Sequence, residues 1–289
     1  MSAEEEIRAL VRQRAGRPEL VAQAAAARRR RIGWGDQRLM IIAADHPARG
    51  SIGVRDRPDA MASRIDLLTR LRTALSRPGV HGVVATADVV EDLLLLGDLD
   101  DRLVIGSMNR GGLTGTVFEL DDRFTGYDTR TSVDMGFDGG KMLCRIDPGD
   151  PGTASTLESC GHAVTDLARH KLMAMVEPLP VRRVDGQARL DTDPDALIRA
   201  IGVGQALGAS SAYTWLKLPV VADMDRVLES TTLPVLLLGG ESAGPEAYLS
   251  WQKALDNPGV RGLVVGRALL YPPDDDVAAA VDAAAGLLR

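Results

Sequence analysis

Short apolar runs recur along this chain and alternate with longer segments in which apolar and polar residues mix. Near-continuous apolarity is typical of strands that are buried on both faces of a parallel sheet. The mixed segments between them are helix-like. The runs span residues 39–44, 80–85, 103–107, 140–146, 172–177, 213–218, 233–238 and 260–265, and the predicted helices include 58–77, 87–96, 154–170, 194–207, 222–230, 244–257 and 275–288.

Eight such strands, each followed by a helix or a loop, predict an α/β protein with the (β/α)8 fold, the TIM barrel. Right-handed crossovers between neighbouring parallel strands make this the simplest topology. A doubly wound open sheet is the alternative, but DHPARGSIG after the first run lacks the spacing of the dinucleotide fingerprint. The third connection, residues 121–139, predicts no definite element.

An N-terminal helical extension precedes the predicted barrel. Residues 3–31 have helical composition, interrupted by Gly16 and Pro18, and end in the run Arg28–Arg31. We therefore divide the chain into an extension over 1–33 and a barrel over 34–289. The arginine run is consistent with an anion or partner site, but a solvated helix face packed across one barrel end is the favoured interpretation.

Bulk composition narrows the function classes. The 289 residues are 45% hydrophobic, enough for one large core, and the formal net charge of −6 does not favour nucleic acid or anionic lipid as a partner. The apolar runs are far too short to cross a membrane, and the acidic start does not resemble a secretory signal, so we expect a cytoplasmic protein. Cys144 and Cys160 have no metal or disulfide spacing and are expected to be buried thiols.

Lysine is scarce in this chain, which makes each lysine informative. Of 34 basic residues other than histidine, only Lys141, Lys171, Lys217 and Lys253 are lysines. A lysine can lose its proton inside a protein, whereas an arginine effectively cannot. Lys217 stands in the apolar strand YTWLKLP, where a charged ammonium is costly unless its pKa falls or a carboxylate pairs with it. It is the leading candidate for a Schiff-base nucleophile.

Functional side chains of a barrel lie at the carboxyl ends of its strands. A second lysine, Lys141, lies on the fourth strand. If Lys141 and Lys217 both point inward, each positive charge is expected to disfavour protonation of the other amine. The alternatives are an outward position or a buried ion pair with Glu177 or Asp45. The predicted catalytic residues are Lys217, Glu177, Asp45 and Lys141, and the predicted substrate-binding residues are His46, Arg49, Asn109 and Arg145.

The last two strand ends predict a phosphate site. LLLGGES and VVGRALL place glycines where backbone N–H groups can approach an anion, and an arginine adds a bidentate donor. Barrels often bind phosphate after these strands. The simpler alternative is that the glycines only make tight turns. The predicted phosphate-binding residues are Gly239, Gly240, Ser242, Gly266 and Arg267.

Histidine is too scattered for a metal site. His46, His81, His162 and His170 form no H-x-H or H-E-x-x-H pattern, so we predict neither a metal nor an organic cofactor.

The motifs AADHPARG, GGKMLCRID, MVEP, YTWLKLPV, VLLLGGES and GLVVGRAL together resemble class I aldolases over residues 39–270. The resemblance is strongest to the tagatose-1,6-bisphosphate and sulfofructose-phosphate aldolase group, and more distant to the archaeal-type fructose-bisphosphate and deoxyribose-phosphate aldolases. It implies that Lys217 forms the Schiff base and that Asp45, Lys141 and Glu177 line the pocket. His46, followed by Pro47, departs from the amide or glycine expected there.

These features predict a lyase that cleaves a phosphorylated keto-sugar or sugar acid, with Glu177, Asp45 or a water accepting the hydroxyl proton. A deoxy-keto-gluconate phosphate from inositol catabolism is one possible substrate. The rival classes are a sugar-phosphate isomerase or epimerase, which needs no Lys217, and a non-catalytic sugar-phosphate-binding barrel. The N-terminal extension favours a homo-oligomer.

Overall fold

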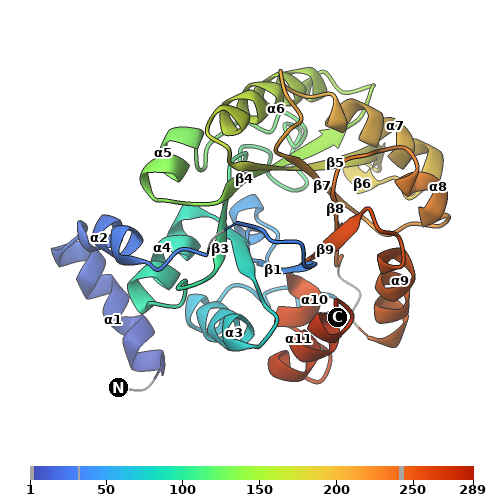
Figure 1. The fold of residues 1–289 in the computed structure, drawn as a ribbon. Helices are drawn as coiled ribbons and strands as arrows, with labels where there is room; N and C mark the ends of the chain where they lie inside the picture. Colours follow the sequence, from blue (N-terminus) through green and yellow to red (C-terminus); the bar gives the residue numbers. More distant parts are fainter. Residues whose placement is uncertain (1–2, 32, 241–243) are drawn as a thin grey trace.

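A closed ring of parallel strands organises the chain, and helices surround it (Figure 1). The computed structural model describes residues 3–31, 33–240 and 244–289. The strands are β1 (Leu39–Ala43), β2 (Gly82–Ala85), β3 (Leu103–Ser107), β4 (Gly139–Ile146), β5 (Met173–Val184), β6 (Gln187–Leu190), β7 (Thr214–Leu218), β8 (Val235–Leu238) and β9 (Val260–Val265).

Within the described residues, eight of these strands pair in parallel in the order β4-β3-β2-β1-β9-β8-β7-β5, and β4 pairs with β5 to close the ring. This is the predicted (β/α)8 TIM barrel. The strands are buried along almost their whole length, as their continuous apolarity requires. Cys144 and Cys160 are both buried free thiols, as predicted.

Helices follow most strands and cover the outside of the ring. The predicted bounds 87–96 coincide with those of α4, whereas most other predicted helices differ from the observed ones by a few residues at their ends. The helices are α1 (Ala3–Gly16), α2 (Leu20–Ala27), η1 (Pro47–Arg49, a 3-10 turn), α3 (Arg64–Ser76), α4 (Ala87–Leu96), α5 (Thr129–Asp134), α6 (Gly152–Arg169), α7 (Pro194–Gln205), α8 (Met224–Leu228), α9 (Pro245–Leu255), α10 (Arg267–Leu270) and α11 (Val277–Gly286). No described helix is both long and apolar enough to span a bilayer.

The N-terminal segment differs from the single helix predicted over 3–31. It forms α1 and α2, which pack on the flank of the barrel against α3 and α4 rather than across its end. The helix stops at Ala27, so the arginine run is extended chain. Arg28 is buried and donates to the carbonyls of Arg102 and Gly136, so the predicted solvated face is wrong for this residue.

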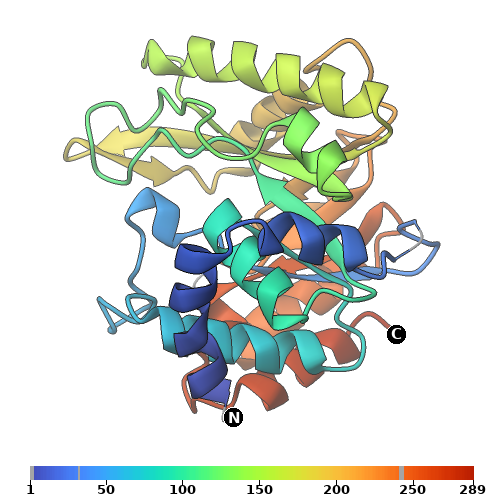
Figure 2. The ribbon, with the colours of Figure 1, turned by 90° about the vertical axis from the view of Figure 1, so that its left-hand side faces the viewer.

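A β-hairpin is the main element that the apolar pattern missed. Strand β5 continues past Glu177 to Val184 and turns through Asp185 and Gly186 into the antiparallel strand β6. Figure 2 shows this hairpin and the long loop after β3 projecting beyond the barrel on the same side. That side is the carboxyl end of the strands.

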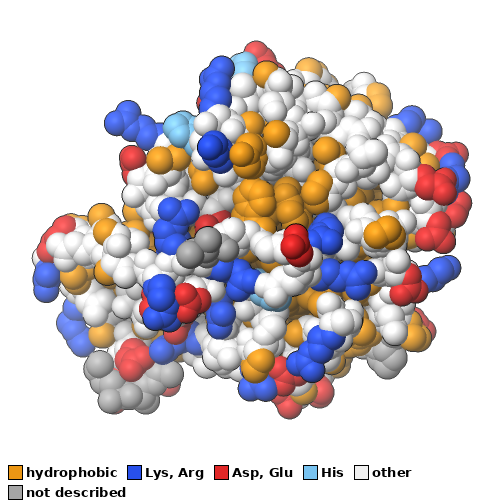
Figure 3. All heavy atoms as spheres, in the orientation of Figure 1, with side chains coloured by type: hydrophobic (Ala, Val, Ile, Leu, Met, Phe, Trp, Pro, Cys, Tyr) orange, Lys and Arg blue, Asp and Glu red, His pale blue; other side chains and the backbone are white. Residues whose placement is uncertain are grey.

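Aromatic side chains close the opposite end of the barrel. Trp34 packs edge-on against Tyr213 and Trp215, with ring centroids 6.2 and 5.9 Å apart. On this face apolar side chains gather near the centre, with lysines and arginines around them (Figure 3). The plugged end leaves the carboxyl end as the accessible side of the barrel interior.

Candidate active site

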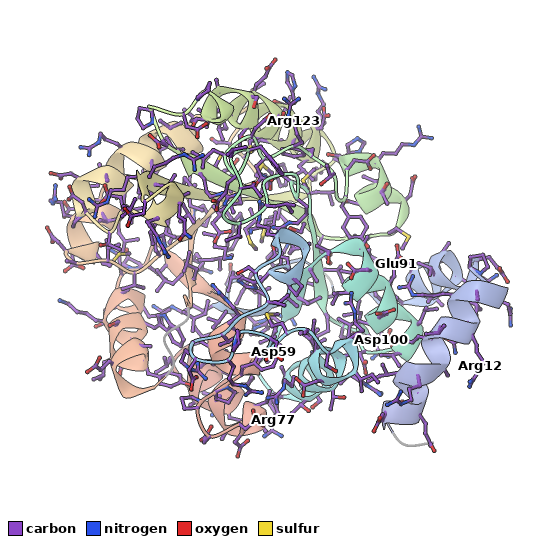
Figure 4. The ribbon with its side chains drawn as sticks, turned by 180° about the vertical axis from the view of Figure 1, so that it is seen from behind. Arg12, Asp59, Arg77, Glu91, Asp100 and Arg123 are labelled. Carbon is purple, nitrogen blue, oxygen red and sulfur yellow. The ribbon has the colours of Figure 1, made fainter. Side chains whose placement is uncertain are left out.

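A pocket of about 420 Å³ opens at the carboxyl end of the strands. Figure 4 views this end, with the labelled Asp59 and Arg123 on opposite sides of it. The pocket receives side chains from nearly every strand end, including most of the predicted site residues. It is lined by Ala43, Asp45, His46, Arg49, Ser51, Arg110, Thr114, Lys141, Leu143, Arg145, Glu177, Leu179, Leu190, Lys217, Leu238, Gly239, Gly240, Val264, Gly266 and Arg267.

Alternation along β4 explains how its polar residues reach this pocket. Lys141, Leu143 and Arg145 line the pocket, while Met142 and Cys144 between them belong to the apolar core outside the ring. The parallel register pairs Leu143 with Glu177 of β5. One face of two neighbouring strands therefore carries both a lysine and a glutamate.

The two lysines share one carboxylate. Lys141 Nζ lies 2.5 Å from Glu177 Oε2, and Lys217 Nζ lies 2.9 Å from Glu177 Oε1. All three side chains are buried. Burial would raise the pKa of Glu177, but the two ammonium groups outweigh it and hold that pKa at about 2. Glu177 is therefore a charged counter-ion that positions both amines.

Asp45 is the second carboxylate of the cluster. Its Oδ2 accepts hydrogen bonds from Ser107 Oγ at 2.9 Å, Arg110 at 2.6 Å and Lys141 Nζ at 3.1 Å. Burial opposes ionisation, yet Arg110 and Lys141 keep the pKa of Asp45 well below its usual range. Arg110 and Ser107 were not among the predicted site residues, although Arg110 directly follows the polar end of the third strand.

At Lys141 the effect of burial on the pKa outweighs the effect of the neighbouring charges, unlike at Asp45 and Glu177. Burial lowers its pKa, and Lys217 and Arg110 add to the effect, while Asp45 and Glu177 act against it. The predicted repulsion between two inward-pointing lysines and the alternative of a buried ion pair therefore both hold in this structure. The ammonium of Lys141 gives up its proton more readily than an exposed lysine does.

The predicted substrate-binding arginines, Arg49 and Arg145, line the pocket, but their guanidinium groups bind other groups of the protein. Arg49 donates to the carbonyls of Asn109 and Gly112 and pairs with Asp122. Arg145 pairs with Glu119 and donates to the Glu119 and Gly112 carbonyls. Together they anchor the loop that follows β3 as a wall of the pocket.

Asn109, the remaining predicted substrate-binding residue, lies outside the pocket lining. It is fully buried. Its amide donates to the Leu143 carbonyl at 2.6 Å and accepts from the Leu143 N–H at 2.8 Å. Asn109 therefore ties β4 to the loop after β3, and its contact with substrate stays a prediction.

The predicted phosphate-binding residues Gly239, Gly240, Gly266 and Arg267 line one side of the pocket, after β8 and β9, and Ser242 lies outside the described residues. Packing explains two of the glycines, because a Cβ at Gly239 would meet Val265 at 2.3 Å and one at Gly266 would meet the Ala43 carbonyl at 2.2 Å. In the described part of the chain, no group of three or more His, Cys, Asp or Glu side chains has the arrangement of a metal site.

The β5–β6 hairpin adds a wall that was not predicted. Leu179 and Leu190 line the pocket from it, and Leu190 is 38% exposed. The dipeptide Asp185–Gly186 is the signal that identifies this hairpin, because both residues have positive φ, as a type I′ turn requires.

A family model for the Cgl0159-like family matches residues 37–285, so the chain belongs to that family. The crystal structure of Cgl0159 from Corynebacterium glutamicum is 53% identical, covers 98% of this chain and 97% of that one, and superposes with a TM-score of 0.96. No curated protein matches the sequence.

More distant solved structures share the fold. A Schiff-base-forming fructose-1,6-bisphosphate aldolase is 20% identical, covering 93% of this chain and 100% of that one, with a TM-score of 0.65. An archaeal fructose-1,6-bisphosphate aldolase, solved with its catalytic lysine bound to a carbinolamine intermediate, is 19% identical, covering 93% and 99%, with a TM-score of 0.64. At these identities the likeness concerns the barrel.

Proposed function

We propose that this protein is a class I aldolase that cleaves a phosphorylated keto-sugar or sugar acid through a Schiff base at Lys217. The observation that carries the proposal is a buried lysine that lines the pocket with its Nζ 2.9 Å from a charged glutamate. A buried amine held in position at a pocket is suited to condense with a ketone. Schiff-base aldolases of the same fold support this choice.

In the proposed reaction, Lys217 first loses its ammonium proton to solvent in the pocket, the free amine attacks the substrate carbonyl, and loss of water gives a protonated imine. A base then removes the proton of the β-hydroxyl, the bond between the α and β carbons breaks, and its electron pair moves into the imine to form an enamine as an aldehyde departs. Protonation of the α carbon and hydrolysis release the ketone and restore Lys217.

The neighbours of Lys217 have distinct tasks in this scheme. Glu177 holds both amines, and Asp45 holds Lys141 from the other side. Because its pKa is lowered, Lys141 supplies the proton that turns the carbinolamine hydroxyl into water. The lysine–glutamate–lysine arrangement supports kinship with the tagatose-1,6-bisphosphate and sulfofructose-phosphate aldolase group.

The substrate is proposed to carry a phosphate. Gly239, Gly240, Gly266 and Arg267 lie together on the β8–β9 side of the pocket, where backbone N–H groups and a guanidinium suit an oxyanion. The fructose-bisphosphate aldolases of similar fold are named for phosphorylated keto-sugars, which supports the same substrate class here.

Reductive trapping tests the proposal. The protein is incubated with dihydroxyacetone phosphate, the ketone that a 1-phosphorylated ketose releases on cleavage, and with fructose 1,6-bisphosphate, then treated with borohydride. We expect a mass increase on the peptide that contains Lys217. The Lys217→Met variant should lose the adduct, whereas Lys253→Met, which removes a lysine of α9 outside the pocket, should keep it.

The rival classes give other results. An isomerase or epimerase would convert sugar phosphates without any borohydride-sensitive adduct, and a binding barrel would bind them without turnover. Absence of an adduct on Lys217 with both probes overturns the Schiff-base assignment.

A further inference from the structure

The proposed cleavage needs a group that accepts the β-hydroxyl proton, and both carboxylates of the cluster are poorly suited to it. Glu177 has one oxygen on Lys217 and the other on Lys141. Asp45 has three donors on Oδ2. Both oxygens of Glu177 and Oδ2 of Asp45 are therefore already engaged by donors, and these oxygens are not available to accept a proton from substrate.

His46 lies beside this cluster and lines the same pocket. Its side chain is 24% exposed, and its buried Nδ1 has no hydrogen-bond partner. The nearest carboxylate oxygen is Asp45 Oδ1, 4.0 Å from Nδ1. The side-chain donors to Asp45 all use Oδ2, so the unpaired nitrogen of His46 faces the less occupied oxygen of Asp45.

We propose that His46 is the catalytic acid–base of this pocket, with Nδ1–H directed to Asp45 and Nε2 exchanging the proton with substrate. The proposal rests on the proposed aldolase function. Nε2 takes the β-hydroxyl proton as the carbon–carbon bond breaks, which gives an imidazolium and an enamine. The imidazolium then returns that proton to the α carbon of the enamine, so the histidine ends the cycle neutral and no other reactant is required.

In this proposal Asp45 fixes the tautomer and the orientation of the His46 ring. A carboxylate on one ring nitrogen fixes the tautomer, leaves the lone pair on the other nitrogen and stabilises the imidazolium when it forms. The separation of 4.0 Å is longer than a hydrogen bond, and catalytic hydrogen bonds commonly tighten only when substrate is bound. The absence of a side chain at Gly266 leaves room for the ring, because a Cβ there would lie 3.0 Å from His46 Cε1.

The charges around His46 make its basicity depend on the substrate. Burial first, and then the positive fields of Arg267, Lys217 and Lys141, lower its pKa to about 3, while Asp45 acts in the opposite direction. A phosphate bound beside Arg267 offsets those positive fields and raises the pKa of His46. Burial, the largest cause of the low pKa, is unchanged by the phosphate, so a bound phosphate moves the pKa of His46 upward from about 3 without restoring its ordinary value.

Exchange of a carbon-bound proton isolates this step from Schiff-base formation. The protein is incubated with dihydroxyacetone phosphate in deuterated water, and loss of the α-carbon proton is followed by NMR, in parallel with borohydride trapping. For His46→Gln we expect trapping on Lys217 at the parental level and exchange slower by about 100-fold or more. His46→Asn, which keeps a polar group near Asp45, should behave alike, and the control His162→Gln on the exposed face of α6 should exchange like the parent.

The outcomes separate the two proposals. Parental exchange rates in both His46 variants overturn the role of His46 and leave the aldolase proposal intact. Loss of trapping together with exchange in a folded His46 variant assigns the residue to binding and also overturns the acid–base role. Absence of trapping in the parent with this probe and with fructose 1,6-bisphosphate overturns the aldolase function, and the acid–base role falls with it.

Discussion

Lys217 and Glu177 form a buried ion pair between adjacent strands, with Nζ 2.9 Å from Oε1. The other oxygen of Glu177 is paired with Lys141, which also contacts Asp45, so Glu177 is shared by two amines. A buried charge that loses its partner is far costlier than one at the surface. The pocket is therefore sensitive to the charge of Glu177 in both stability and chemistry.

Glu177→Gln should lower the free energy of unfolding by about 3–5 kcal/mol, because it leaves two buried amines without their shared counter-ion. Urea unfolding followed by circular dichroism measures the change. Glu246→Gln on the exposed part of α9 is the matched control and should change stability little. Equal stability of the two variants would contradict the pairing described here.

Stability should fall as the pH drops below about 6.5, the ordinary pKa of histidine. Burial, reinforced by nearby cations, lowers the folded-state pKa of His46 to about 3 and that of His81 to about 4. Between these values and 6.5 the unfolded chain binds protons that the folded chain does not, so the stabilisation present above 6.5 is lost as pH falls. Unfolding free energies measured across this window should depend less on pH in His46→Gln, whereas His162→Gln should follow the parent.

Asn109→Ala should affect stability rather than substrate affinity. The amide satisfies both polar groups of the Leu143 backbone, and unsatisfied buried groups cost about 1–3 kcal/mol each. Denaturant titration should reveal this loss. If the KM of the folded variant rises instead while its stability stays unchanged, Asn109 contacts substrate after all.

Leu190→Glu should weaken binding of a phosphorylated ligand, because a negative charge on the hairpin enters the pocket wall near the bound anion. We expect KM to rise on the order of tenfold, which corresponds to about 1.4 kcal/mol. The fraction of Lys217 trapped at saturating dihydroxyacetone phosphate should remain high. Leu249→Glu, on an exposed position of α9, serves as the control, and an identical KM in both would remove the hairpin from the binding site.

The barrel was predictable because its signal is local. Each parallel strand is buried on both faces and so shows as an apolar run, and the rule that functional groups follow such strands selected Asp45, Lys141, Glu177 and Lys217. These four side chains are brought into one cluster by the structure.

The missed features depend on contacts between distant segments. The predicted strand stopped at residue 177, whereas β5 continues through Pro178 and Pro180 to Val184, and the Asp185–Gly186 turn was not used. Asn109 hydrogen-bonds the backbone of Leu143, which is 34 residues away in the sequence, and no local sequence pattern predicts this hydrogen bond. Likewise, Arg49 and Arg145 resemble substrate ligands in sequence, and only the fold brings Asp122 and Glu119 to them.

The alternation of β4 also restricts how this protein can change over evolutionary time. Lys141 and Arg145 both line the pocket because an even number of residue steps separates them along the strand, while Cys144 lies outside the ring and contacts Cys160 of α6. Inserting or deleting one residue between Lys141 and Arg145 would send one of the two ends of the strand to the wrong face. Substitutions in this strand can therefore retune the pocket one residue at a time, whereas changes in its length are expected to be eliminated by selection.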